Sequence, residues 1–456
     1  MASISRCYDS HAHFVAASVF KYGIDCSQNQ WELGRLNQLR GSNSDDFVIF
    51  GWGWTDLTFI LQRLSQFEEE QAARRLALSR KDGHALLINE PAYLALQPKL
   101  LRLKQNSDWL LQHLQHYPFQ NKHYFVLQEG LGIWAWTQLL QSQEGQLDFF
   151  LLESQKLWRE AGFTHVRDMS GNWKQWQALM SLEQRGVWHT YLVQNFEYHP
   201  FLILEEVIDE VLQAQKFQSS HPHLRVGGIK LYLDGTIGFK TAAMTCGAGP
   251  FCGSLLWSDQ ALEDTIAQIW ARNIPVCLHT IGDRAVAQAL TIYERLAQKG
   301  CEGIMHLEHV EWVQKRDLPR FQKKNLVIHA QPCHWLADLG LLKSSQHPSL
   351  EDISLPDESL VFCPYYEWLK LKIPVFWGFD APIYYPQLGL NWRGLLDTAS
   401  MVHRVWGVSL PEATALSSWT HVLRVGHEYP DPSWGACCVS DFDENNAWRP
   451  EGIACG

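Results

Sequence analysis

Hydrophobic and polar positions follow two alternating patterns over the later part of the chain. From residue 163 onward, short runs of β-branched and apolar residues are separated by segments in which apolar residues recur at helical spacing. The runs predict these strands: FTHVRD (163–168), WHTYLVQ (188–194), RVGGIKLYL (225–233), IPVCLH (274–279), GIMHLEH (303–309), LVIHAQ (326–331) and IPVFWGFD (373–380). Strands that alternate with helices in this way are typical of parallel α/β folds.

The segments between the predicted strands carry helix signals. After IPVCLH, Asp283 is placed to cap a helix and Gly300 to end it. One face of that helix is apolar: Val286, Ala289, Leu290, Tyr293 and Leu296. Pro364 is placed to begin a later helix that includes Trp368. With residues 4–13 as the first strand, eight strands and their crossovers predict an α/β fold, a (β/α)8 barrel of the TIM type.

The stretch between the first two predicted strands is too long for a single crossover. Within it, residues 55–75 have helical spacing, residues 75–89 contain a polar turn and a strand candidate, and residues 148–162 predict the crossover helix. We therefore expect a large insertion over the barrel mouth, where the loops that follow strands lie. The predicted domains are a barrel of residues 1–13 and 163–426, an insertion of residues 14–162 that ends in the first crossover helix, and a tail of residues 427–456.

Composition narrows the range of functions. A net charge of -11 and a pI near 6.0 argue against a nucleic-acid-binding protein. The first residues have no apolar signal core, and no run of about eighteen uncharged apolar residues occurs, so neither export nor a membrane partner is expected. Eleven cysteines without a CxxC pair indicate reduced thiols and a cytoplasmic protein. The expected partner is a small-molecule substrate, and a homodimer remains an open alternative to a monomer.

Chemically active residues gather where the predicted strands end. His11 and His13 are two positions apart, so their side chains share one face of the first strand and can hold one ion. Such a pair alone is weak evidence, because polar groups on a half-exposed strand are common. Later strand ends add four candidates: Lys230, His279, His309 and Asp380. The carboxyl ends of barrel strands converge on one cavity, so we expect these side chains to meet there.

These residue types suit a divalent metal site. Neutral imidazoles favour Zn and related ions, and a carboxylate such as Asp380 both binds metal and exchanges protons. Lys230 is unusual in this set, because two dications repel an ammonium. If the amine loses its proton and adds carbon dioxide, the resulting carbamate is an anionic bridge between two ions. A salt bridge, or an anchor for substrate beside one ion, explains Lys230 equally well.

The sequence resembles the amidohydrolase superfamily, in particular its amidohydrolase family 3 branch of metal-dependent hydrolases. The resemblance rests on YDSHAHF (8–14), KDGHALLIN (81–89), AGFTHVRDM (161–169), GGIKLYLDGTIGFKTAAM (227–244), HTIGDRA (279–285), LEHVEW (307–312), QPCH (331–334) and GFDAP (378–382). It implies two divalent ions, Zn by preference, bridged by a carboxylated Lys230. By the same resemblance, the first ion is held by His11, His13 and Asp380, and the second by His279 and His309.

Two features depart from the family pattern. Relatives usually carry β strands before the His-x-His strand that pair with C-terminal strands in a small sandwich, whereas only ten residues precede His11. A reduced or absent β-sandwich subdomain is therefore expected. Phe379 also stands before Asp380, where relatives commonly have serine, so one hydrogen bond beside the metal is expected to be missing.

The resemblance implies hydrolysis of a carbon–nitrogen bond. A water shared by two divalent ions becomes a metal-bridging hydroxide near neutral pH, and Asp380 acts as general acid/base by passing its proton to the leaving nitrogen. The expected substrate is a non-peptide amide, a formamide or a cyclic amide. The alternatives are an ester or lactone hydrolase, a mononuclear deaminase and, less favoured, a metal-binding barrel without turnover.

Several further residues have both a functional and a structural interpretation. His84 and His334 are the substrate-binding candidates, although His84 fits a turn histidine equally well. Asp283 either orients a ligand imidazole or begins a helix. His329 fits a core histidine better than a pocket residue, and Asp234 fits a structural role in the loop after Lys230. Four tryptophans form either an aromatic wall or packing under the insertion: Trp52, Trp54, Trp134 and Trp136.

Overall fold

The computed structural model describes residues 8–28, 31, 47–70, 74–81, 83, 85–103, 113–142, 145–237, 240–245, 253–335, 359–371, 373 and 375–387 of the 456-residue chain. Eight strands form one parallel sheet in the order β1-β8-β9-β10-β11-β12-β14-β16. Their bounds are β1 (Tyr8–Ala12), β8 (His165–Gly171), β9 (Tyr191–Glu197), β10 (Leu224–Tyr232), β11 (Val276–Thr280), β12 (Met305–His309), β14 (Leu326–Ala330) and β16 (Val375–Trp377). All eight predicted strands are therefore present in the described part of the chain.

The first and last strands of this sheet meet and nearly close it. Ala12 and Ala381 form a parallel bridge. The backbone N–H of Asp380 donates to the carbonyl of His11 at 2.8 Å, and that of His13 donates to the carbonyl of Ala381 at 2.9 Å. The predicted (β/α)8 barrel is confirmed, and its closure brings the two ends of the described chain into one site.

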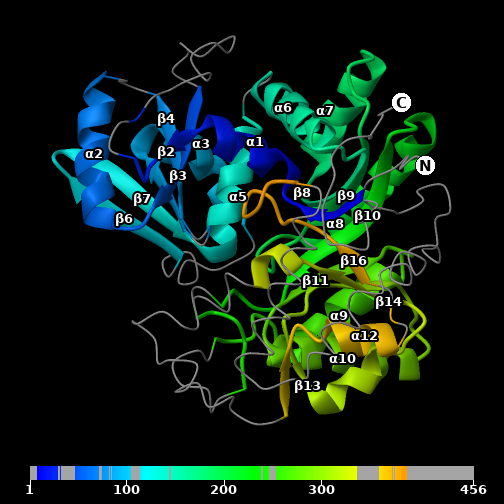
Figure 1. Cartoon of the computed structure of the whole chain (residues 1–456). Helices are drawn as coiled ribbons and strands as arrows, with labels where there is room; N and C mark the ends of the chain where they lie inside the picture. The colour runs from blue at the N-terminus through cyan, green and yellow to red at the C-terminus, as the bar shows by residue number, and fades with distance from the viewer. Residues whose placement is uncertain are drawn as a thin grey trace, which may run out of the picture.

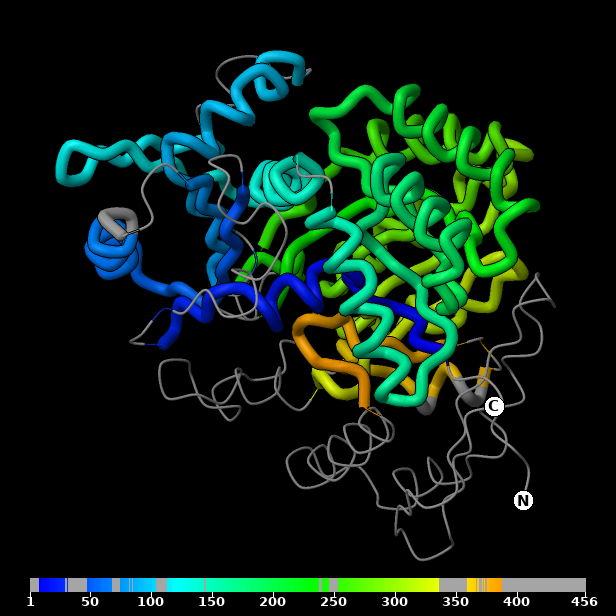
Figure 2. Tube along the Cα trace, turned by 90° about the horizontal axis from the view of Figure 1, so that it is seen from above, coloured from blue at the N-terminus to red at the C-terminus, as the bar shows by residue number. Residues whose placement is uncertain are grey.

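Helices pack on the outside of the barrel (Figure 2). They include α6 (Gln146–Glu160), α7 (Trp173–Gln184), α8 (Leu204–Phe217), α9 (Asp259–Trp270), α10 (Asp283–Gln298) and the short α12 (Tyr365–Lys370). Gly162 and Gly300 follow α6 and α10 with φ of 86° and 73°, a left-handed conformation that stops a helix and that glycine adopts without strain. The cap of α10 was predicted one residue too late. Gly282 is the capping residue, and the Asp283 carboxylate instead accepts hydrogen bonds from Thr245 and Gln314.

Residues between β1 and β8 build a second sheet beside the barrel (Figure 1). Its order is β2-β3-β4-β5-β7-β6, parallel from β2 to β4 and antiparallel thereafter. The strands are β2 (Ile24–Asp25), β3 (Val48–Trp54), β4 (Arg75–Arg80), β5 (Ala85–Asn89), β6 (Leu114–Phe119) and β7 (Lys122–Gln128). The sequence predicted the helix now seen as α2 (Leu57–Glu70) and the strand β5, but not the sheet.

Three more helices belong to this region. Helix α1 (Phe14–Tyr22) begins directly after β1 and is joined to α6 by side-chain hydrogen bonds, including Ser154 Oγ to the Phe14 carbonyl at 2.6 Å. Helix α3 (Glu90–Leu100) packs on the insertion sheet. Helix α5 (Glu129–Leu140) stands between that sheet and the barrel in both views (Figures 1 and 2). The insertion is therefore connected to the barrel through α1 and α5.

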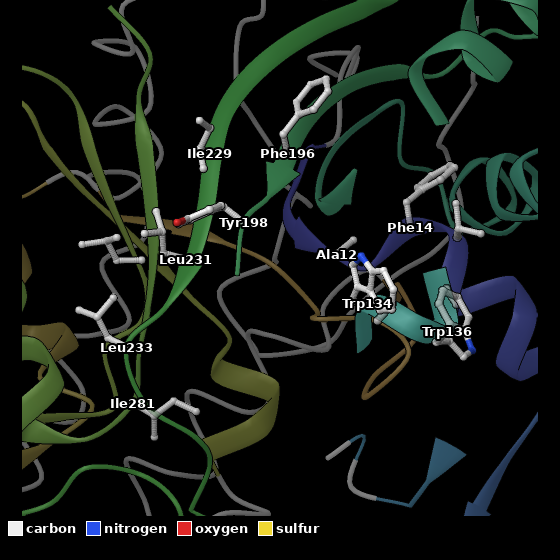
Figure 3. Packing of buried hydrophobic residues seen from close by; sticks show 14 of the residues in the cluster. Ala12, Phe14, Trp134, Trp136, Phe196, Tyr198, Ile229, Leu231, Leu233 and Ile281 are labelled. Carbon is white, nitrogen blue, oxygen red and sulfur yellow. The ribbon is translucent and has the colours of Figure 1, made fainter. Parts of the chain in front are cut away.

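Successive residues of β10 face alternately toward the hydrophobic core and toward the barrel interior. Figure 3 shows Ile229, Leu231 and Leu233 in succession along this segment. All three are fully buried in the hydrophobic core. Because alternate residues of a strand face opposite sides, Lys230 and Tyr232 lie on the other face, toward the barrel interior.

No helix among the described residues is long and apolar enough to cross a membrane. The predicted tail, residues 427–456, lies outside the described residues, as does the question of a reduced sandwich. The cytoplasmic location and the homodimer stay predictions.

Candidate metal centre

Four histidines and an aspartate converge at the carboxyl ends of the barrel strands. The ring centroids of His11 and His309 are 4.7 Å apart, and those of His279 and His309 are 4.4 Å apart. The Nε2 atoms of His11 and His13 lie 3.4 and 3.2 Å from Oδ1 of Asp380. His11 comes from β1, and His13 is the residue that follows this strand. The others come from β11, β12 and the turn after β16, so barrel closure assembles the cluster.

The donor atoms of this cluster fit a cation. One ligand atom each from His11, His309 and Asp380 lie within 4.8 Å of one another. Nε2 of His11, Nδ1 of His309 and Oδ1 of Asp380 are buried and make no hydrogen bond within the described part of the chain. Buried polar atoms are normally satisfied, so these atoms together point to a ligand that binds nitrogen and oxygen, and a divalent ion suits them.

Lys230 has the same property. Its Nζ is fully buried in β10 and has no hydrogen-bond partner among the described residues. Burial lowers the pKa of Lys230 below its ordinary value, although the Glu308 and Asp380 carboxylates oppose the shift. A lower pKa leaves more of the amine unprotonated, and only the unprotonated amine adds to carbon dioxide, so this environment is compatible with a carbamate.

The pKa values of the other side chains favour metal binding. Burial lowers the pKa of His279 to about 3, helped by the charge of Lys230, so that its imidazole is neutral near pH 7. Burial also lowers the pKa of His309. Burial opposes ionisation of Asp380, but the His11 and His13 rings beside it hold its pKa well below the ordinary value. His279 and His309 therefore offer neutral nitrogens and Asp380 an anionic oxygen, the forms that bind metal.

Two of these side chains sit on strained backbone. His309 has φ of 74° and Asp380 has φ of 54°, both in the left-handed region that residues other than glycine rarely adopt. Each such residue costs about 1–3 kcal/mol, and they are concentrated at functional sites. The fold thus maintains an unfavourable backbone conformation at two residues of the cluster, His309 and Asp380.

Groups behind the cluster orient the imidazoles. His11 Nδ1 lies 2.7 Å from Oε2 of Glu308, and Arg167 donates to the other carboxylate oxygen at 2.8 Å. Both partners are fully buried. His13 Nδ1 is hydrogen-bonded to Ser170 Oγ. Such contacts fix which ring nitrogen faces the metal and how the ring is turned.

A second polar group lies at the ends of β9 and β10. The hydroxyl of Tyr232 donates to Oε1 of Glu197 at 2.8 Å, and His199 Nε2 lies 3.6 Å from the same oxygen. Burial opposes ionisation of Glu197, but His199 and the Tyr232 hydroxyl hold its pKa below the ordinary value. The charge of Glu197 also acts on His13 and that of Asp380 on Tyr232, so the two groups are neighbours.

The cluster opens into a cavity of about 430 Å³. The barrel contributes His13, His279, His309 and Asp380 to its wall. Much of the remaining wall is aromatic or aliphatic: Phe20, Trp52, Leu86, Ile133, Trp136, Tyr198, Phe201, Tyr232, Leu256, Trp257 and Ile383. The insertion and α5 thus supply part of the wall opposite the barrel strands.

The remaining candidate residues occupy other positions. His84 lies outside the described residues. His334 is buried, with Nε2 2.8 Å from the carbonyl of Phe379, and does not line this cavity, so a substrate contact there stays a prediction without geometric support. His329 is a buried histidine that pairs with His306 at 2.9 Å, as its structural interpretation required. Asp234 accepts three backbone N–H groups, from Ala243, Ile281 and Gly282, which also indicates a structural role.

Sequence reasoning missed the groups that support the metal site. Glu308 and Arg167 lie within segments that were quoted for other residues, LEHVEW and AGFTHVRDM. An acid next to His309 and an arginine within an apolar strand were the available signals, because charged groups inside a barrel must find partners. Glu197 and Tyr232 carried no comparable signal, since their pairing depends on the register between β9 and β10.

Comparisons with known proteins agree with the barrel fold. Residues 8–387 match the model of the amidohydrolase family. A structure described as an uncharacterized metal-dependent hydrolase from Pyrococcus horikoshii OT3 shares 19% identity at a TM-score of 0.62, covering 92% of this chain and 81% of that one. A counterpart from Pyrococcus furiosus shares 20% identity at a TM-score of 0.56, covering 92% and 82%. No curated protein matches the chain in sequence.

Proposed function

Because the chain belongs to the amidohydrolase family of metal-dependent hydrolases, we propose that it hydrolyses a carbon–nitrogen bond in a non-peptide amide, formamide or cyclic amide. One observation carries the proposal. Among the described residues, buried ligand atoms of His11, His309, Lys230 and Asp380 make no hydrogen bond, and they lie at the end of the barrel that opens into the cavity. Such unsatisfied atoms are costly to a fold and useful to a catalyst.

Two divalent ions, zinc by preference, would be held by this set. His11, His13 and Asp380 would bind one ion, and His279 and His309 the other, with a carboxylated Lys230 between them. When bound, the ions would lower the pKa of a water molecule and polarise the substrate carbonyl. Glu308 would hold the His11 ring through Nδ1, so that Nε2 faces the site.

Asp380 is the proposed general acid/base. Its low pKa keeps the carboxylate ionised at neutral pH, ready to accept the proton of the attacking water. As the tetrahedral intermediate collapses, the same carboxyl group would give this proton to the leaving nitrogen, which must be protonated to depart. The strained backbone at Asp380 holds its Oδ1 between the rings of His11 and His13, at the mouth of the cavity.

The cavity wall supports a substrate with an apolar or aromatic group. Trp52 and Trp136 from the insertion region face the same space as Phe201 and Trp257 from the barrel loops. A volume of about 430 Å³ accommodates a small molecule rather than a folded polypeptide. Aromatic side chains bury a large area against flat apolar groups, so they would supply much of the binding energy.

Metal analysis combined with a substrate panel tests this proposal. Purified protein loaded with zinc should contain about two ions per chain and should cleave members of a panel of aromatic N-acyl amides and formamides. The panel also holds matched esters, lactones and aminoheterocycles. One ion per chain with ammonia released from aminoheterocycles would favour a deaminase, cleavage of esters or lactones alone would favour that alternative, and absence of metal and turnover would contradict the proposal.

A further inference from the structure

One tyrosine in the cavity wall has no part in the hydrolysis as proposed. Tyr232 ends β10, lines the cavity and is two residues after Lys230. Its ring centroid lies 5.5 Å from that of His279 and 5.1 Å from Nζ of Lys230. A substrate whose scissile bond reaches the metal ligands would therefore pass close to Tyr232.

The hydrogen of the Tyr232 hydroxyl is already committed. It is donated to Oε1 of Glu197 at 2.8 Å, and the Glu197 side chain is only 8% exposed and does not line the cavity. A carboxylate accepts hydrogen bonds only, whereas a phenolic hydroxyl has one hydrogen and can also accept. Toward the cavity, the Tyr232 oxygen is therefore an acceptor without a hydrogen to give.

The neighbours of Tyr232 fix this arrangement. The ring of His199 stacks on that of Tyr232, with centroids 5.8 Å apart and planes within 1° of parallel. The same His199 ring also stacks on the ring of Phe201, with centroids 5.1 Å apart. Helix α5 covers His199 closely, because a Cβ added to Gly130 would lie 2.7 Å from its Nδ1. Packing thus holds the Tyr232 ring beside Glu197, and the carboxylate, which can only accept, keeps the hydroxyl hydrogen directed at itself.

We propose that the Tyr232 oxygen accepts a hydrogen bond from the N–H of the substrate amide, so that this cavity selects amides that carry an N–H over esters and lactones of the same shape. The inference rests on the proposed function and specifies its substrate class. An ester has no hydrogen at that position and would place its own lone pairs against those of Tyr232. A site built to accept a hydrogen bond discriminates against an analogue that lacks the donor, because the buried acceptor is then left unpaired.

The test compares kcat/KM for two probes in the zinc-loaded enzyme. The probes are the best aromatic N-acyl amide from the panel and the ester that differs from it by oxygen in place of N–H. Tyr232→Phe keeps the ring and removes the acceptor, so it should lower kcat/KM for the amide by about three- to tenfold and change the ester value by less than about twofold. If the ester binds without being cleaved, its Ki as a competitive inhibitor replaces kcat/KM.

A second variant tests the positioning role of Glu197. In Glu197→Gln, the side-chain amide can donate to the Tyr232 oxygen and leave the hydroxyl hydrogen free to point into the cavity. The amide-to-ester ratio should then fall by about three- to tenfold, as in Tyr232→Phe. Tyr293→Phe, which removes a hydroxyl on helix α10 outside the cavity, should keep the wild-type ratio.

The outcomes separate this inference from the proposed function. A wild-type enzyme that cleaves esters but no amide overturns both. A wild-type enzyme that cleaves amides, with Tyr232→Phe and Glu197→Gln changing both probes by one factor or neither, overturns the inference alone. Melting temperature and zinc content, measured on each variant, identify a loss of folding, and a ratio measured on either folded variant decides the question.

Discussion

Two groups of polar side chains lie inside the same barrel and differ in one respect. The metal-site group consists of His11, His13, Lys230, His279, His309 and Asp380. The inner network consists of Arg167, Asn195, Cys277, His306, Glu308 and His329. Cys277 is two residues before His279 on β11, so the network lies one layer deeper.

The two groups differ in how many of their buried polar atoms have a hydrogen-bond partner. In the inner network, Arg167 donates to Glu308 at 2.8 Å and to Cys277 Sγ at 2.8 Å, and Cys277 in turn donates to Asn195 at 3.1 Å. In the metal-site group, four donor atoms lack a partner among the described residues. Burial and charge alone therefore do not mark a functional site, whereas several buried atoms without a hydrogen-bond partner at one point do. In the inner network only His329 Nδ1 lacks such a partner among the described residues.

The two groups are linked through His11. Its Nδ1 faces Glu308 of the inner network, and its Nε2 faces Asp380. We expect changes in the inner network to act first on stability and changes in the metal-site group to act first on turnover. The following predictions test that division, beginning with the largest expected effect.

Replacement of Asp380 by asparagine should abolish most turnover. The Asn side chain keeps an oxygen near His11 and His13 but cannot accept a proton from water, so we expect kcat to fall by about 10²- to 10⁴-fold. Steady-state kinetics on the best amide, together with zinc content and melting temperature, measure the effect. Near-normal turnover in Asp380→Asn with zinc fully retained would show that another group transfers the proton.

Replacement of Arg167 by methionine should instead destabilise the fold. It leaves the buried carboxylate of Glu308 without the guanidinium that neutralises it, and breaking such a pair costs about 3–5 kcal/mol. Urea unfolding of the zinc-free protein measures the free energy of unfolding. Arg185→Met is a matched control, because Arg185 pairs with Asp148 at 3.1 Å but is 53% exposed, and an exposed pair contributes at most about 1 kcal/mol. Equal losses in the two variants would contradict the distinction between buried and exposed pairs.

The barrel was predictable from sequence because each of its strands corresponds to a short apolar run that can be recognised locally. Runs such as IPVCLH and LVIHAQ are mostly apolar, since parallel strands covered by helices are buried on both faces. The insertion sheet was not predicted, although β3 and β7 have comparable runs, VIFGWGW and KHYFVLQ. Its strands pair in mixed directions, and the pairs β2–β3, β3–β4 and β5–β7 are separated by long stretches of chain, so no local pattern specifies the whole sheet.

The same distinction applies to the candidate site. His11, His279, His309 and Asp380 were predictable because strand ends in a barrel converge, whatever the rest of the chain does. The hydrogen bond from Tyr232 to Glu197 was not predictable, because it depends on the register in which β9 and β10 pair. His334 shows the limit of this reasoning, since a histidine that follows a strand end can face a backbone carbonyl instead of the cavity.

Removal of metal should lower the stability of the wild-type protein by an amount that the metal-site group controls. Ions that bind only the folded chain stabilise it by about 2.7–4.1 kcal/mol at 100 to 1,000 times the dissociation constant, so a chelator should remove that increment. His309→Ala should lose most of the zinc-dependent increment. His116→Ala, which removes one member of the exposed pair His116–His123 on the insertion sheet, should retain it.

The smallest effect concerns the pH dependence of stability in the inner network. Burial lowers the pKa of His306 to about 3, helped by the charge of Arg167, from an ordinary value of 6.5. Between these values the unfolded chain binds a proton that folded His306 does not. His306 therefore leaves the free energy of unfolding unchanged by pH above pH 6.5. As pH falls from 6.5 toward 3, the free energy of unfolding decreases, with a slope of up to about 1.4 kcal/mol per pH unit.

His306→Asn removes this titration and should make the fall in stability between about pH 6.5 and 4.5 shallower by up to about 1.4 kcal/mol per unit. Urea unfolding in the presence of chelator measures the slope without the pH dependence of metal binding. An unchanged slope would mean that His306 is protonated within the fold, next to Arg167. The inner network would then hold an unpaired charge, and partnering could no longer separate it from the metal-site group.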